Sequence, residues 1–219
     1  MSEFTLERPT TRQTESHQLT NWTPRQDSPL DHVDVVTIEG IETETTVAIQ
    51  ELKGLSHLIL RGNSHVPSFC KAVKQALGVE LPVMSCTSMQ NNELRIFWQS
   101  PNEWLIIGPP NSAEKIEQSL RNCLQGHFAV TDISSSQTLV TIKGENAENV
   151  LRKSTSYDVD IRNFPIGKVA GIAFSRSQVQ LRRTDKTSFE LIIRRSFADY
   201  IWMWLMDASN EYGVIFIKD

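Results

Sequence analysis

The chain has 219 residues, of which 39% are hydrophobic and 22% are charged, and this composition is typical of a folded globular protein. No apolar run approaches the roughly 20 residues that a membrane-spanning helix needs. The formal net charge is -4 and the basic residues are scattered. This argues against nucleic acid as the main ligand, because binding to a phosphate backbone needs a clustered positive field.

Further sequence features predict where the protein is located and whether it has disulfides. The adjacent pairs Arg182-Arg183 and Arg194-Arg195 are interpreted as parts of a solvated face. The N-terminal stretch MSEFTLERPTTRQTES lacks the apolar centre of a secretory signal, which predicts a cytoplasmic protein. An odd number of cysteines without a CxxC spacing suits a reducing compartment and predicts no disulfide framework. The cysteines are Cys70, Cys86 and Cys123.

Residues 1–44 differ from the rest of the chain. They are rich in polar residues, and a sustained apolar pattern begins only at Val33–Ile38. The pattern predicts an extended arm with at most one short strand. Two interpretations remain open, a disordered tail or an arm that becomes ordered by lying on another subunit. Residues 45–219 are expected to form an α+β domain, with halves at about 45–125 and 126–219.

From residue 46 the hydrophobic pattern predicts strands and helices. A helix is predicted over Pro67–Leu77, with its apolar residues on one face and Gly78 at its end. Ser112 is expected to cap a second helix over Ala113–Leu124, which Gly126 terminates. Strands are predicted at Thr46–Ile49, Ser56–Leu60, Leu94–Trp98 and Trp104–Ile107.

The second part of the chain follows the same plan. Gly144 leads into a helix that carries Ala147, Val150 and Leu151 on one face, and residues 157–167 are expected to form a loop. The later strands are expected to form an antiparallel meander. Strands are predicted at Phe128–Ile133, Thr138–Lys143, Val169–Phe174, Val179–Arg183, Phe189–Arg194 and Val214–Ile217.

The chain contains one pattern twice. The stretch Ser56–Gly62 (SHLILRG), a helix and Glu103–Ile107 (EWLII) recur as Thr138–Gly144 (TLVTIKG), a helix and Phe189–Ile193 (FELII). The alternative is a coincidence between two amphipathic stretches. A true repeat implies two copies of one unit, each with an apolar sheet face that the other must cover. We therefore predict two similar halves with mainly antiparallel sheets and helices packed on them.

The last helix is apolar over much of its circumference. Ser196 and Asp199 form an S-x-x-D pattern that predicts its start. Trp202 and Met206 lie about a right angle away from the centre of its apolar stripe. One interpretation is that the C-terminal strand or the arm covers these two side chains. The other is a subunit interface, which makes Trp202 and Met206 the candidates for partner contact.

No catalytic constellation is recognisable. The glycine-rich nucleotide motifs, HExxH and GxSxG are absent, so no catalytic, cofactor-binding or metal-binding residue is assigned. His57 and His65 are the closest histidines, and ordinary surface histidines are favoured over a metal site. Asp158 and Asp160 are interpreted as part of a solvated loop. Asp132, near the end of a strand, is a better candidate for a ligand contact.

Four blocks carry a family resemblance. They are Asn102–Pro109 (NEWLIIGP), Asp132–Ser134 (DIS), Gly144–Ala147 (GENA) and Arg194–Trp202 (RRSFADYIW). With these blocks in this order, the chain resembles the gamma subunit of heterotetrameric sarcosine oxidase. The corresponding blocks expected in that family are PDEWLLLGP, DVSDGRT and RRSFADYLW. The resemblance runs from about Leu52 to Ala208, and RRSFADY is its specific part.

The resemblance implies a function that the residues alone do not show. The family's complex oxidises the N-methyl group of sarcosine to give glycine and hydrogen peroxide, with tetrahydrofolate as one-carbon acceptor. FAD, covalent FMN, NAD, zinc and tetrahydrofolate are expected in the partner alpha, beta and delta subunits, and none in this chain. The implied fold is similar to the folate-binding domain of the glycine-cleavage aminomethyltransferase.

The first hypothesis is therefore a non-catalytic subunit that acts in assembly and stability of the complex. The alternative is a free-standing folate-binding or aminomethyltransferase-like protein that uses the cleft between the halves. A third hypothesis keeps the subunit role but assigns the complex a related N-methylated amine as substrate.

Overall fold

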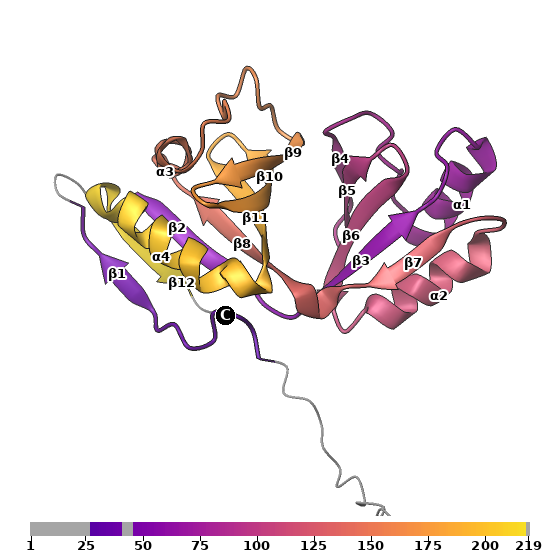
Figure 1. Ribbon diagram of the computed structural model, residues 1–219, viewed down its shortest axis with the longest axis horizontal. Coiled ribbons are helices and arrows are strands. Elements are labelled where there is room, and N and C mark those ends of the chain that lie inside the picture. The colour runs from indigo at the N-terminus through magenta and orange to yellow at the C-terminus, as the bar shows by residue number, and fades with distance from the viewer. Residues whose placement is uncertain (1–26, 41–45, 218–219) are drawn as a thin grey trace, which may run out of the picture.

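The computed structural model describes residues 27–40 and 46–217. Two β-sheets lie between two pairs of helices, so that the molecule has four layers (Figure 1). This arrangement confirms the predicted α+β class. None of the helices in these ranges combines the length and the apolarity that are needed to cross a membrane.

One sheet has seven strands in the order β1-β12-β2-β8-β11-β10-β9, and the other has five in the order β4-β5-β6-β3-β7. All pairings are antiparallel except that of β12 with β2. The strands are β1 Val36–Ile38, β2 Val47–Leu52, β3 Leu55–Arg61, β4 Ser88–Gln90, β5 Arg95–Ser100, β6 Glu103–Pro110, β7 Ala129–Asp132, β8 Gln137–Lys143, β9 Val169–Phe174, β10 Ser177–Asp185, β11 Ser188–Arg194 and β12 Val214–Ile217. The α-helices are α1 Pro67–Leu77, α2 Ala113–Cys123, α3 Ala147–Ser154 and α4 Ala198–Ser209.

The two copies of the repeat have the same local topology. In the five-stranded sheet β3 leads into α1 and pairs antiparallel with β6, with Leu58 opposite Ile106. In the seven-stranded sheet β8 leads into α3 and pairs antiparallel with β11, with Val140 opposite Leu191. The predicted internal repeat is therefore confirmed.

Gly62 and Gly144, which end the two repeated strands, let neighbouring atoms come closer than a side chain would allow. A Cβ atom on Gly62 would overlap the ring of Phe69 on α1. A Cβ atom on Gly144 would overlap the carbonyl oxygen of Thr46, and Gly144 also has a φ of +124°, which other residues rarely adopt. Each strand can therefore turn into its helix only with glycine at this position.

The first strand of each half joins the sheet of the other half. β2 pairs with β8, whereas β3, which follows β2 directly, belongs to the five-stranded sheet. β7 pairs with β3, whereas β8, which follows β7, belongs to the seven-stranded sheet. The chain thus crosses between the sheets twice, at the β2-β3 turn and at the β7-β8 connection. Each sheet needs a strand from the other half, which ties the two halves together.

Both faces of the central strands are buried. On β6, Trp104 and Ile106 pack with α1 and α2, and Leu105 and Ile107 face the other sheet. All four side chains are fully buried. A strand that is covered on both faces is apolar at consecutive positions, which explains the EWLII and FELII segments.

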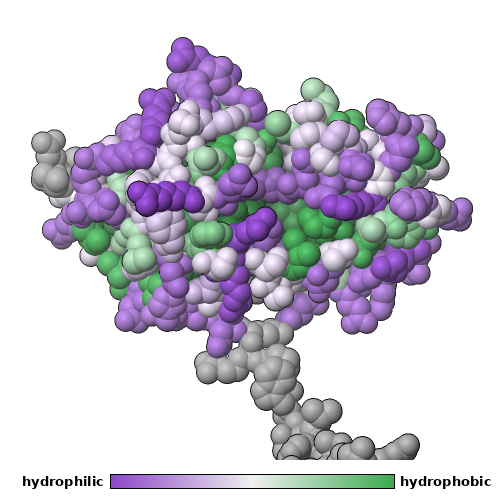
Figure 2. Space-filling model, viewed as in Figure 1, coloured by the Kyte–Doolittle hydropathy of each residue, from purple (hydrophilic) through white to green (hydrophobic). Residues whose placement is uncertain are grey.

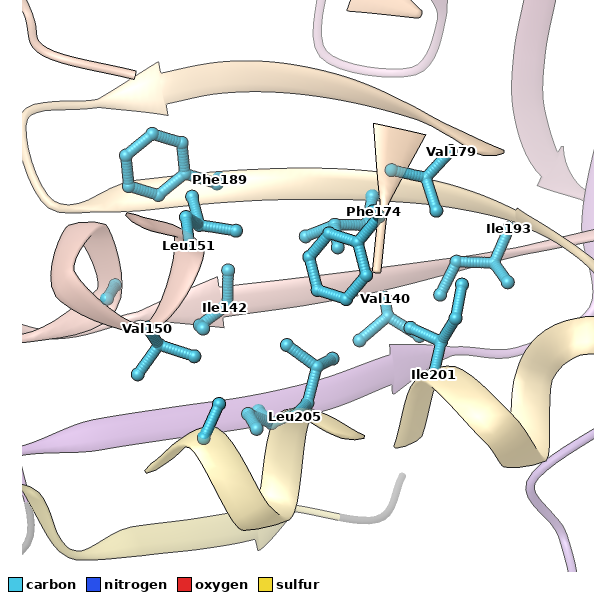
Figure 3. Packing of buried hydrophobic residues seen from close by; sticks show 14 of the residues in the cluster. Val140, Ile142, Val150, Leu151, Phe174, Val179, Phe189, Ile193, Ile201 and Leu205 are labelled. Carbon is cyan, nitrogen blue, oxygen red and sulfur yellow. The ribbon is translucent and has the colours of Figure 1, made fainter. Parts of the chain in front are cut away.

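The largest core cluster lies between the seven-stranded sheet and helices α3 and α4 (Figure 3). Ile201 and Leu205 of α4 and Val150 of α3 meet Val140 and Ile142 of β8 there. The apolar stripe that was predicted for the last helix therefore does face the core.

The interpretation of Arg182-Arg183 as a solvated pair was wrong. The two residues are only 3% and 0% exposed. Arg182 pairs with Glu190 at 2.9 Å, and Arg183 pairs with Glu148 at 2.8 Å and lies over the ring of Phe189. Burial is possible because each guanidinium meets a carboxylate.

Two predicted helix caps are also wrong. The Ser112 hydroxyl donates to the carbonyl oxygen of Pro109 instead of capping α2. Helix α4 begins at Ala198, after a 3-10 turn over Arg195–Phe197, and Asp199 pairs with His32 at 2.9 Å. The short strand β4 was not predicted, because its three residues show no apolar pattern.

Part of the predicted N-terminal arm lies in the described residues. Leu30 and Val33 are buried in the core of the seven-stranded sheet, and β1 pairs antiparallel with β12. Residues 27–40 thus pack on their own chain. Residues 1–26 and 41–45 of the arm lie outside the described residues.

Candidate functional site

A cavity of about 500 Å³ lies where the chain crosses between the two sheets. This volume is within the range of small-molecule sites. The β2-β3 turn, the β7-β8 connection, the start of α2 and residues 27–29 form its wall. The lining residues are Asp27, Ser28, Pro29, Leu52, Gly54, Leu55, Ser56, His57, Asn111, Ala113, Glu114, Asp132, Ser134, Ser135, Gln137, Thr138 and Arg195.

His57 is the most unusual residue of this wall. It lies on the face of β3 that looks toward the other sheet, as do Leu55 and Ile59, and it is 1% exposed. Neither of its ring nitrogens has a hydrogen-bond partner among the residues that the structure describes. Leaving such a buried polar group unpaired costs about 1–3 kcal/mol.

Burial keeps the His57 ring neutral. Loss of hydration lowers its pKa from 6.5 to about 4, against smaller opposing effects from the Ser134 backbone and the Asp132 charge. At neutral pH the ring therefore offers one N–H donor and one acceptor nitrogen.

Ser134 holds the two crossing segments together. Its hydroxyl donates to Oδ1 of Asp132 at 2.5 Å and accepts the backbone N–H of His57 at 3.0 Å. The carbonyl oxygen of His57 accepts the backbone N–H of Ile133 at 2.8 Å. These bonds fix β3 against the β7-β8 connection, which positions His57 and Asp132 in one wall.

Further unpartnered acceptors lie beside this wall. Oε1 of Gln137 is buried without a hydrogen-bond partner in the described part of the chain. Glu51 is 1% exposed, and its Oε1 accepts from the Thr138 hydroxyl at 2.7 Å, whereas its Oε2 has no partner among the described residues. Among the described residues, the crossing region thus has buried acceptors without a hydrogen-bond partner.

The charged residues of the lining are mostly acidic. Asp27, Glu114 and Asp132 are the acidic residues of the described lining, and Arg195 is its one arginine. Arg195 donates to the backbone carbonyl of Asp27 at 2.7 Å. The lining therefore has more carboxylates than guanidinium groups.

The structure brings together only part of the residues that the sequence singled out. Asp132 lines the cavity, and its contact with a ligand stays a prediction. His57 is buried, so its interpretation as a surface histidine was wrong, whereas His65 is exposed. Asp158 and Asp160 lie in the 157–167 loop, where Asp160 accepts from Arg162. Within residues 27–40 and 46–217, no three His, Cys, Asp or Glu side chains come together as a metal-binding group.

The three cysteines are free thiols in the residues described. Burial raises the pKa of Cys70, which decreases its thiolate fraction, and its Sγ lies 3.4 Å from the carbonyl oxygen of Ser64.

The partner-contact candidates are covered by their own chain. Met206 is buried, and Trp202 is half-buried with its ring edge-on to Phe216 of β12. The C-terminal strand thus covers this side of α4, as one of the two interpretations predicted. The exposed apolar residue of α4 is Met203, at 56%. Contact of Trp202 and Met206 with a partner stays a prediction.

Sequence reasoning missed His57 and Gln137 as lining residues. A signal was present for His57, because it alternates with Leu55 and Ile59 on one face of an apolar strand. Gln137 gave no signal, since its place depends on how the two halves pack.

Comparison with known structures defines the class of fold. The chain is similar to the glycine cleavage system aminomethyltransferase T from Bartonella henselae, with a TM-score of 0.60 and 12% identity over 79% of this chain and 48% of that chain. At this identity the likeness shows the fold alone. The two packed sheets with outer helices are thus an aminomethyltransferase-like arrangement.

Closer similarity identifies the family. Residues 61–211 match the sarcosine oxidase, gamma subunit family, and the chain belongs to this family. It is 27% identical to the sarcosine oxidase subunit gamma from Corynebacterium sp. strain P-1 over 90% of this chain and 97% of that protein. It is also similar to a chain of the heterotetrameric sarcosine oxidase from Corynebacterium sp. U-96, with a TM-score of 0.75 and 26% identity over 85% of this chain and 95% of that chain.

Proposed function

We propose that this chain is the non-catalytic gamma subunit of a heterotetrameric sarcosine oxidase and acts in assembly and stability of the complex. The observation that carries this proposal is the family match over residues 61–211, together with the structural likeness to a chain of such a complex. In the proposed complex sarcosine is oxidatively demethylated to glycine, with tetrahydrofolate as one-carbon acceptor. The partners are the alpha, beta and delta subunits, and the location is cytoplasmic.

The chemistry of the described residues supports a subunit without a reaction centre. The thiol of Cys70 has a raised pKa, and the hydroxyl of Ser134 donates to a carboxylate rather than to the imidazole of His57. Neither group is activated as a nucleophile. The family resemblance, and not this chemistry, is the ground on which we propose FAD, FMN, NAD, zinc and tetrahydrofolate for the partner subunits.

Exposed apolar side chains support the role in assembly. Met84 is 71% exposed, Val83 57% and Ile166 54%, and the two loops that carry them are joined by a hydrogen bond from the backbone N–H of Ser88 to the carbonyl oxygen of Gly167 at 3.0 Å. Figure 2 shows hydrophobic surface near the middle of the drawn face, between hydrophilic side chains. Apolar surface of this kind is favoured where a partner covers it.

Omission of the chain tests this role. The alpha, beta and delta subunits are produced with and without this chain, and sarcosine-dependent hydrogen peroxide formation and the mass of the complex are measured. We expect turnover and a stable complex only when the chain is present, and no turnover by the chain alone. A fully active and stable oxidase without the chain contradicts the proposal.

A second candidate is a free-standing folate-binding or aminomethyltransferase-like protein. The cavity between the sheets and the aminomethyltransferase-like fold favour it. Calorimetric titration of the full chain with tetrahydrofolate separates the two functions. The subunit role predicts no saturable heat, whereas the second candidate predicts stoichiometric binding.

A further inference from the structure

We propose that the free edge of strand β9 binds an extended acidic segment of a partner subunit as an added strand. Four features of β9 carry this inference: its length, the direction of its backbone groups, their exposure and the charges at its two ends. The partner is a subunit of the same complex, and in that point alone the inference rests on the proposed function.

β9 is the longest edge strand in the described part of the chain. The two sheets end in β1 and β9 and in β4 and β7 (Figure 1). β1 and β4 have three residues each and β7 has four, whereas β9 has six residues, VAGIAF, without a charge or a proline. Natural proteins shorten edge strands or place charges on them to prevent the addition of another strand. β9 has neither kind of protection along its length.

The odd-numbered residues of β9 direct their backbone groups away from β10. The N–H of Val169 donates to the carbonyl oxygen of Cys86 at 2.9 Å, at one end of the strand. The N–H of Ser175, just after the other end, donates to the carbonyl oxygen of Ser154 at 2.7 Å. The direction of the backbone groups alternates along an antiparallel strand, so the odd-numbered residues between these two ends point the same way.

Gly171 and Ala173 are these residues, and their outward N–H and C=O groups form no hydrogen bond to another described residue. Both residues are exposed, and the exposed surface of a glycine is backbone surface because it has no side chain. A Cβ atom on Gly171 would meet nothing within 4 Å, which leaves room for a bulky side chain of an added strand. Aromatic side chains cover edge glycines in this way.

The charges at the two ends define the added segment as acidic. Lys168 directly precedes β9, and Arg176 lies in the turn that follows it. Lys168 donates to the carbonyl oxygen of Asn163 at 2.7 Å, Arg176 is exposed, and neither side chain forms an ion pair with a described residue. The backbone N–H of Arg176 donates to the Tyr200 hydroxyl at 3.4 Å, which ties the turn to α4. Carboxylates at the ends of an added strand are attracted by these two cations.

The length of the edge defines the length of the segment. At about 3.3 Å per residue, six residues span about 20 Å. The fitting partner is therefore an extended segment of about seven residues, with a carboxylate at each end and a bulky side chain over Gly171. In added strands of this kind the main-chain hydrogen bonds provide affinity and the alternate side chains provide specificity.

A second copy of this chain does not have that chemistry. Antiparallel pairing of two β9 strands that sets Gly171 opposite Ala173 of the second copy also sets Lys168 opposite Arg176 of the second copy. Like charges directly opposite each other destabilise a strand pair. The charges thus favour an acidic partner over self-association.

Titration of the full chain with the peptide acetyl-DVTYTVD-amide tests the inference. Backbone amide NMR spectra are recorded with this peptide and with acetyl-KVTYTVK-amide, which has the same length and the opposite charge. We expect saturable shifts at Gly171 and Ala173, and the acidic peptide to bind at least tenfold more tightly than the basic one. Absence of saturable shifts at these two residues, or equal binding of the two peptides, overturns the inference.

Variants connect the binding to the named residues. Ala173→Pro removes an outward N–H group at a position where an edge strand tolerates proline, and it is expected to weaken binding of the acidic peptide at least tenfold. Arg176→Glu reverses one end charge and is expected to weaken this binding about fivefold. Lys115→Glu makes the same charge change at an exposed position of α2 and is the matched control. If Arg176→Glu and Lys115→Glu bind the acidic peptide equally, the inference is overturned, also where Ala173→Pro does not fold.

Hydrogen exchange of the co-expressed complex identifies the occupant. We expect exchange at Gly171 and Ala173 to be fast in the isolated chain and at least tenfold slower when the alpha, beta and delta subunits are bound. Fast exchange in an assembled complex overturns the inference, whereas failure of the complex to assemble contradicts the proposed function and leaves the peptide titration to decide. Slow exchange in the isolated chain assigns the edge to a second copy if the chain is a dimer, or to its own residues 1–26 if it is a monomer, and also overturns the inference.

Discussion

The Nε atom of Arg95 on β5 lies 3.0 Å from Oε1 of Glu190 on β11, and this ion pair joins the two sheets. The other oxygen of Glu190 accepts from Arg182 at 2.9 Å. Arg182 also donates to Ser88 at 2.9 Å and to Gln90 at 2.6 Å, both on β4 of the opposite sheet. A closed polar network thus crosses the apolar interface between the sheets and fixes their relative position.

Removal of the central carboxylate should destabilise the chain. In Glu190→Gln the guanidinium of Arg182 stays buried without its counter-charge, and we expect a loss of about 3 kcal/mol in the free energy of unfolding. Urea unfolding measures this loss. The control is Glu117→Gln, which breaks an i,i+4 pair with Arg121 on the surface of α2 and should cost below about 0.5 kcal/mol. Equal losses in the two variants would contradict the role of the network.

His57 should make the stability depend on pH. Its pKa is about 4 in the folded chain and 6.5 as the ordinary value, so the unfolded state binds more protons between these two pH values. The His57 contribution is fully present above pH 6.5 and is lost as the pH falls toward 4, which amounts to about 3 kcal/mol. Urea unfolding at several pH values measures this slope.

The matched control is another histidine. His57→Phe should flatten the slope between pH 6.5 and 4, whereas His127→Gln, at an exposed position, should retain it. A slope that persists unchanged in His57→Phe would show that other groups cause it.

The repeat glycine of the second half should not tolerate a side chain. In Gly144→Ala the new Cβ overlaps the backbone of Thr46, and the φ of +124° is strained for alanine. We expect the free energy of unfolding to fall by more than about 2 kcal/mol, which thermal unfolding measures. Gly171→Ala is the control, since a Cβ there meets nothing within 4 Å, and it should be near neutral. Similar melting temperatures of the two variants would contradict the close approach.

Met203 and Met206 of α4 should contribute differently to the stability of the chain. Met206→Ala removes a buried side chain and should lower the stability of the isolated chain by about 2 kcal/mol. Met203→Ala changes an exposed side chain and should stay within about 0.5 kcal/mol. If Met203→Ala destabilises the chain as much as Met206→Ala does, α4 is not packed as described.

The repeated units could be predicted from the sequence because each depends on local pattern. The apolar spacing in Pro67–Leu77 and the glycine after it specify helix α1 to the residue, and SHLILRG and TLVTIKG both form strands. The strand exchange could not be predicted, since β2 and β3 are adjacent in the chain but belong to different sheets. Local pattern does not specify which distant strand is the neighbour.

The same limit applies to the buried polar residues. Arg182 is buried because Glu190, Ser88 and Gln90 meet it, and two of these three residues lie more than 90 positions away in the chain. Of the cavity lining, only Asp132 was singled out as a ligand contact from the sequence, because a carboxylate at a strand end is visible locally. His57 lies in the same lining as Asp132 only because the two halves of the chain pack together, which the local sequence does not show.

Native mass spectrometry of the co-expressed complex tests the central claim most directly. The account predicts a particle that contains this 24.9 kDa chain together with the alpha, beta and delta subunits, and flavin in the particle but none on the chain when it is released. An active sarcosine-oxidising particle that lacks the chain, or flavin that stays bound to the released chain, would contradict it.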